Sequence, residues 1–128
     1  MKRIVVLSVL TACGGGPETG SGIDGDKPLV ELSDGEITDL CEYTISLGPI
    51  FGDCGNGEFV QIGKTSVGEC LAQYQQRREL FTSCTATVAN AEDCTNEILP
   101  FTPQMLCDDN IDFPDPCDVL FTNECGGL

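Results

Sequence analysis

The chain has 128 residues, nine of them cysteine, and a formal charge of −15 at pH 7. That length suffices for one small domain, and the acidic balance disfavours binding to nucleic acid or to anionic membrane surfaces, because both are negatively charged. With six phenylalanines, two tyrosines, no tryptophan and no histidine, the chain should form a small core that needs cross-links, and it lacks the residue used in Ser-His and Cys-His catalysis.

The N-terminus combines a basic start, MKR, with the apolar run IVVLSVL. This run is too short to cross a bilayer and is typical of a secretory signal. The next residues, LTAC at 10–13, resemble the lipobox of bacterial lipoproteins. The resemblance implies a signal peptide over residues 1–12, lipidation of Cys13, and, with Gly14 following it, an outer-membrane location facing the periplasm or the cell surface. The alternative is an ordinary signal peptide cleaved elsewhere, which would leave Cys13 free or joined to another chain.

Residues 14–28, GGGPETGSGIDGDKP, are rich in glycine and contain one apolar residue, Ile23. Such a composition is typical of a flexible linker, with a reach of about 20–23 Å for fifteen residues. We therefore expect the lipidated cysteine and its tether over 13–28 and a cysteine-rich helical domain over 29–128. Without residues 1–12 the formal charge is −17.

The first predicted helix starts at Ser33 or Asp34 and ends before Gly48, because apolar residues recur at helical spacing between these points. The following segment, IFGDCGNGEFVQIG at 50–63, contains two short apolar runs around Gly-Asn-Gly. Glycine and asparagine supply the positive φ that a tight turn needs. This pattern predicts a β-hairpin with Cys54 near its tip.

Two further helices are predicted by their caps and apolar stripes. Ser66 fits the start of a helix over 67–81, and Thr87 fits the start of one that ends at Pro100. A short helical turn follows over 102–107, and a polar loop then leads into a last helix over 117–125. The fold class we expect is mainly α, with about four short helices and one small β-hairpin.

Eight cysteines lie in this domain, about one for each predicted element: Cys41, Cys54, Cys70, Cys84, Cys94, Cys107, Cys117 and Cys125. They include no CxxC pair, and without histidine they do not resemble a structural zinc site. An even number of cysteines in a small exported domain favours four disulfides. The 105 possible pairings of eight cysteines leave the connectivity open.

The segment DDNIDFPDP at 108–116 resembles the first half of a calcium-binding loop, but the glycine and glutamate of the second half are missing. A looser calcium site would use Asp108, Asn110, Asp112 and Asp115. The alternative is a solvated loop whose last aspartate favours the start of the next helix.

Two other motifs have plain explanations. GKT at 63–65 imitates the end of a phosphate-binding loop, but its glycine spacing is one residue too long, and we exclude it. Arg77 and Arg78 either form an interface or pair with nearby acids and the C-terminal end of their own helix, and we favour the second. Tyr74 is expected in the core.

From Cys41 to Cys125 the pattern is similar to small cysteine-rich lipoproteins of unknown function in Gram-negative bacteria, a resemblance that implies no activity. We expect a protein that is not an enzyme, is attached to the membrane through lipid on Cys13, and presents a rigid acidic domain for protein–protein interaction, adhesion or a structural role. A calcium- or cation-binding envelope module and a small hydrolase with paired carboxylates are the alternatives.

Overall fold

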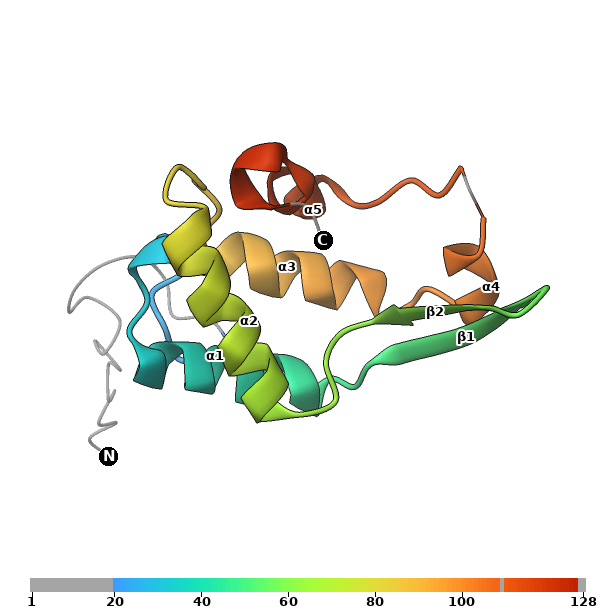
Figure 1. Cartoon of the computed structure of the whole chain (residues 1–128), viewed down its shortest axis with the longest axis horizontal. Helices are drawn as coiled ribbons and strands as arrows, with labels where there is room; N and C mark the ends of the chain where they lie inside the picture. The colour runs from blue at the N-terminus through green and yellow to red at the C-terminus, as the bar shows by residue number, and fades with distance from the viewer. Residues whose placement is uncertain (1–19, 109, 127–128) are drawn as a thin grey trace, which may run out of the picture.

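The computed structural model describes residues 20–108 and 110–126, which are mainly helical with one β-hairpin, as predicted (Figure 1). The longer helices lie together and form most of what we call the body, while the hairpin extends away from them. The body comprises η1 (Leu29–Glu31), α1 (Asp34–Ser46), α2 (Val67–Leu80), α3 (Val88–Ile98), α5 (Asp115–Asp118), η2 (Val119–Phe121) and η3 (Asn123–Cys125). We call the hairpin with its packed helix the arm: β1 (Ile50–Gly55), β2 (Glu58–Ile62) and α4 (Pro103–Leu106).

The three long helices begin after the residues predicted to cap them. The Ser33 hydroxyl accepts a hydrogen bond from Glu36 N at 3.2 Å, and the Glu36 carboxylate accepts one from Ser33 N at 2.9 Å. Ser66 and Thr87 likewise accept from the third residue of α2 and of α3. Because these bonds satisfy amides that the first helical turn leaves without an intrahelical partner, the local sequence determines where each helix starts.

The hairpin turns at Asn56 and Gly57, whose φ values are 55° and 79°. Its strands are antiparallel, with Gly52 of β1 opposite Val60 of β2. A Cβ atom at Gly52 would overlap the side chain of Pro103 in α4. The missing side chain at this position therefore allows α4 to pack directly on β1.

The core of the body is formed mainly where helices meet. α1 packs against α2, and α3 packs against α5. Leu32, Ile37, Leu40 and Val88 are among the fully buried side chains of this core. Burial of apolar area at these contacts supplies the main favourable term of folding.

The C-terminal segment differs from its prediction. Instead of one helix over 117–125, the chain forms α5 and η2, becomes extended at Thr122 (φ −68°, ψ 157°), and then forms η3. The Thr122 hydroxyl donates to the Val119 carbonyl at 2.8 Å, a local bond that competes with continued helix. Disulfides at Cys117 and Cys125 hold both parts of the segment against the rest of the body.

Residues 20–28, which the composition assigned to a flexible tether, pack against the body. Ile23 is buried, and Lys27 and Gly25 accept hydrogen bonds through their carbonyls from the first amides of α3, Val88 N at 3.0 Å and Ala89 N at 2.9 Å. The described part of the folded unit therefore begins at residue 20 rather than at residue 29. The composition did not reveal this, because the contacts are made largely by backbone groups that satisfy the N-terminus of a helix.

Candidate functional site

Four disulfides use all eight cysteines predicted to form them. Three lie in the body: Cys41–Cys70 joins α1 to α2, Cys94–Cys117 joins α3 to α5, and Cys84–Cys125 joins the α2–α3 connection to η3. The fourth, Cys54–Cys107, joins β1 to the end of α4 within the arm. Each removes conformational freedom from the unfolded chain, typically contributing about 2–4 kcal/mol. None of these four bonds crosses between the arm and the body.

The outward side of the hairpin carries two exposed aromatic residues. Phe51 is 53% exposed and Phe59 is 75% exposed. Phe51 lies opposite Gln61, and Phe59 lies opposite Asp53, so the two rings occupy diagonal positions on one face. We call these four residues the outer hairpin face. Side chains alternate between the two faces of a strand, so the phenylalanines lie on one face of the hairpin and Ile50 and Ile62 on the other. This alternation could have revealed the outer hairpin face from the sequence.

One carboxylate is buried, and the sequence analysis missed it. Glu92 in α3 is 3% exposed. Its two oxygens accept hydrogen bonds from Gly20 N at 2.9 Å and Ser21 N at 3.0 Å, which fasten the start of the described chain to the middle of α3. The sequence did hold a sign of this burial, because Glu92 follows Val88 by four residues and so lies on the apolar stripe of the helix.

Two ion pairs join parts of the chain around the start of α1. The Lys27 ammonium lies 2.8 Å from Glu36, and Arg78 lies 3.0 Å from Asp34 while also donating to the Leu32 carbonyl at 2.8 Å. The bonds from Lys27 and then from the Ser33 amide lower the pKa of Glu36. The side chain of Gln75 and then that of Arg78 lower the pKa of Asp34.

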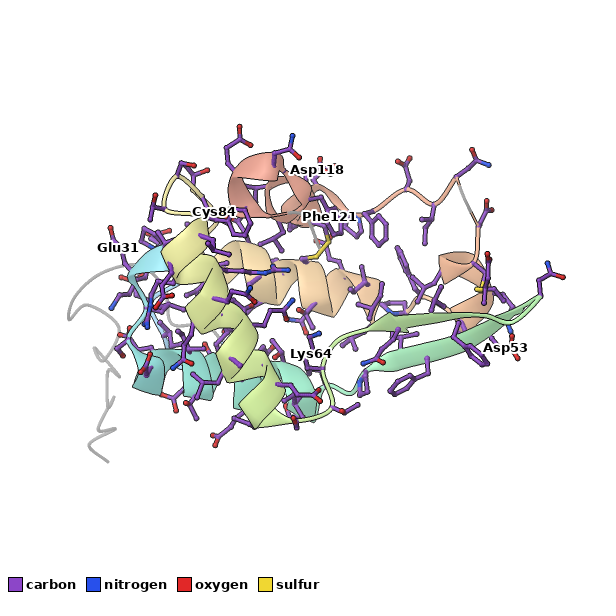
Figure 2. The ribbon with its side chains drawn as sticks, in the orientation of Figure 1. Glu31, Asp53, Lys64, Cys84, Asp118 and Phe121 are labelled. Carbon is purple, nitrogen blue, oxygen red and sulfur yellow. A yellow bond between two sulfur atoms is a disulfide. The ribbon has the colours of Figure 1, made fainter. Side chains whose placement is uncertain are left out.

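A cavity of about 920 Å³ lies between the arm and the body. The hairpin contributes Ile50 and residues 59–62, two of which, Phe59 and Gln61, also belong to the outer hairpin face. The body contributes residues such as Ile98 and Phe121. Lys64, from the connection between β2 and α2, also lines it (Figure 2). Tyr74 is part of the same wall and packs against the core, as expected, and this burial raises the pKa of its hydroxyl.

The predicted calcium ligands are not brought together. The side chains of Asp108, Asn110, Asp112 and Asp115 are all exposed. The Asp108 carboxylate accepts from Asn110 N at 3.0 Å, while Asp115 lies in the first turn of α5. Over residues 20–108 and 110–126, no group of three or more carboxylates and cysteines could hold a metal ion.

The described chain is thus a small, mainly helical domain stabilised by disulfides. Comparison with models of protein families, with curated proteins and with solved structures finds no match. None of the described helices is both long and apolar enough to cross a membrane. The predicted lipidation site, Cys13, and the predicted signal peptide over 1–12 lie outside the described residues.

Proposed function

We propose that this chain is a lipid-anchored protein of the cell envelope that presents a rigid, disulfide-stabilised domain for contact with another protein. The observation that carries the proposal is the use of the cysteines. Four disulfides, which favour an oxidising compartment, consume every cysteine from residue 41 to 125. They leave Cys13, at the end of a lipobox-like segment, as the one cysteine that they do not use.

The attachment of residues 20 and 21 to Glu92 supports a position close to the membrane. Only seven peptide units separate Cys13 from Gly20, and these span at most about 25 Å. In the proposed anchored form, Gly20 therefore stays within about 25 Å of the lipidated cysteine, with the outer membrane as the proposed location.

The outer hairpin face is the surface that we assign to a protein partner. Exposed phenylalanines are costly to leave in water, and aromatic residues are enriched in the cores of protein interfaces. Carboxylates outnumber lysine and arginine across the chain by 21 to 6. A partner with an apolar contact surface and a basic rim fits this combination, because opposite charges raise the rate of association.

The anchor is tested in the native host by comparing the wild-type chain with Cys13→Ser. We expect the wild type to fractionate with membranes and to show, by intact mass, loss of residues 1–12 and a gain of acyl groups. Cys13→Ser should leave the membrane fraction with its four disulfides intact. The matched control, Gly16→Ser, places the same side chain three residues away and should stay anchored. Membrane retention of Cys13→Ser would contradict the proposal.

The partner surface is tested by site-specific photo-crosslinking on the anchored protein. A photoreactive residue at Phe59 should give one defined adduct, and Phe51→Ser should reduce its yield. The control site is Leu80, which is 64% exposed but lies at the end of α2 in the body. Equal adducts from both sites, or an adduct at Phe59 that Phe51→Ser does not weaken, would rule out the outer hairpin face.

A further inference from the structure

The cavity between the arm and the body has a charge pattern opposite to that of the chain. Of the four lysines and arginines in the described residues, three line it: Lys64, Arg77 and Arg78. The residues that line it include no aspartate and no glutamate, although the chain contains 21 of these acids. The charged side chains that line the cavity are therefore all cationic, although Arg78 is paired with Asp34, and this favours an anionic ligand.

The remainder of the wall is mostly apolar. Ile62 and Val60 come from the hairpin, Ile98 and Leu99 from the end of α3, and Phe113 from the segment before α5. An alkyl chain can be buried against this wall without leaving a polar group unsatisfied, and each methylene that it buries favours binding.

The three cations differ in what they already bind. Arg78 is held by the Leu32 carbonyl and by Asp34, so its position is fixed from within the body. Lys64 comes from the short connection between the arm and α2 (Figure 2). An ammonium on a flexible stem can follow the head group of a bound ligand. Arg77 lines the same cavity but already interacts with other groups of the protein, so we assign the head group to Lys64.

We propose that this cavity binds a single-chain amphiphile with one anionic head group, the head lying at Lys64 and the alkyl chain running along the apolar wall. A volume of about 920 Å³ falls within the range of small-molecule sites, roughly 300–1,000 Å³. Free fatty acids and single-chain phospholipids share this chemistry. The site is independent of the proposed lipid anchor, because its residues lie entirely within the described domain.

Binding is measured by isothermal titration calorimetry on the oxidised full chain carrying Cys13→Ser, so that no attached lipid or detergent competes for the cavity. The probes are dodecanoate and dodecyl phosphate below their critical micelle concentrations, dodecanol as the neutral analogue, and dodecyltrimethylammonium as the cation. We expect both anions to bind at least about tenfold more tightly than the alcohol, because a charge-assisted hydrogen bond is lost. The tighter of the two anions identifies the head group of the natural ligand.

Two matched variants separate the site from general electrostatics. Lys64→Gln should weaken dodecanoate binding about tenfold and leave dodecanol binding within twofold. Lys27→Gln changes the net charge equally, but Lys27 does not line the cavity and pairs with Glu36. This variant should therefore bind dodecanoate as tightly as the parent chain does. Shortening dodecanoate to decanoate should cost roughly tenfold, because two methylenes are lost. Thermal melting checks that each variant is folded.

Three results would overturn the proposal. The first is no heat of binding with either anion up to its micelle concentration. The second is equal weakening by Lys64→Gln and Lys27→Gln, which would indicate a diffuse charge effect. The third is tighter binding of dodecyltrimethylammonium than of dodecanoate.

Discussion

Replacing Glu92 with glutamine removes the buried charge that fastens residues 20 and 21 to α3, while keeping the size of the side chain. The amide oxygen of glutamine can accept one of the two amides that the carboxylate accepts at 2.9 and 3.0 Å. The other amide then faces an NH₂ group, which is also a donor. Glu92→Gln should therefore release one end of this contact.

The expected cost is about 2 kcal/mol in the free energy of unfolding. A hydrogen bond to a charged group contributes about 1.5–3 kcal/mol, and the second bond weakens when its acceptor becomes neutral. Removing the charge also relieves the cost of burying a carboxylate that is 3% exposed, and this offsets part of the loss. The remaining contacts of the segment, such as those of Gly25 and Lys27 with α3, keep the loss below that of a large core deletion.

Urea unfolding of the oxidised chain measures the stability, and hydrogen exchange of the Gly20 and Ser21 amides measures the local contact. Glu97→Gln, on an exposed side of the same helix, is the matched control and should stay within about 0.5 kcal/mol of wild type. Unchanged stability together with unchanged protection of both amides would refute the reasoning.

Two further predictions follow. Lys27 lowers the pKa of Glu36, so their pairing stabilises the fold above the ordinary pKa of Glu36 and loses that effect as the pH falls through the lowered folded value. The melting temperature of Lys27→Gln should therefore lie below that of wild type at pH 7 and equal it at about pH 2. A difference in melting temperature that stays constant with pH would contradict this. Gly52→Ala should cost about 1–3 kcal/mol because its methyl group meets Pro103. By contrast, Gly68→Ala should raise the free energy of unfolding by about 1 kcal/mol, because no atom lies within 4 Å of the added Cβ and a helix favours alanine over glycine. Equal shifts of the melting temperature in the two variants would contradict both predictions.

The elements that local chemistry determines were predictable from the sequence. Ser33, Ser66 and Thr87 mark the helix starts because a side-chain oxygen next to a helical pattern satisfies its first amides. The turn at Asn56 and Gly57 was predictable because these residues tolerate positive φ. Eight cysteines were assigned to disulfides, but their partners depend on packing between elements that are far apart in the sequence.

Non-local contacts account for what the sequence did not reveal. Glu92 meets residues 71 and 72 positions earlier in the chain, so nothing near Gly20 indicates that the glycine-rich segment is held. The segment with the predicted calcium ligands shows local contacts instead. Asp108 satisfies its own turn through Asn110 N, and the chain then places Asp112 and Asp115 on the surface. The cavity that Lys64 and Arg77 line is likewise formed by elements that are far apart in the sequence.

The Cys41–Cys70 disulfide also sets a mechanical limit on the arm. The bond closes a loop with a sequence separation of 29, and the whole hairpin lies inside this loop. Ile50 follows Cys41 by nine residues, so a pulling force on the hairpin could move its base no more than about 30 Å from that cysteine, even if the intervening helix unwound. Force applied through the hairpin would thus reach α1 and α2 through the backbone on either side of it, within the limit set by Cys41–Cys70. It would reach α3 by a second covalent path, through the Cys54–Cys107 bond and the backbone from α4 back to α3.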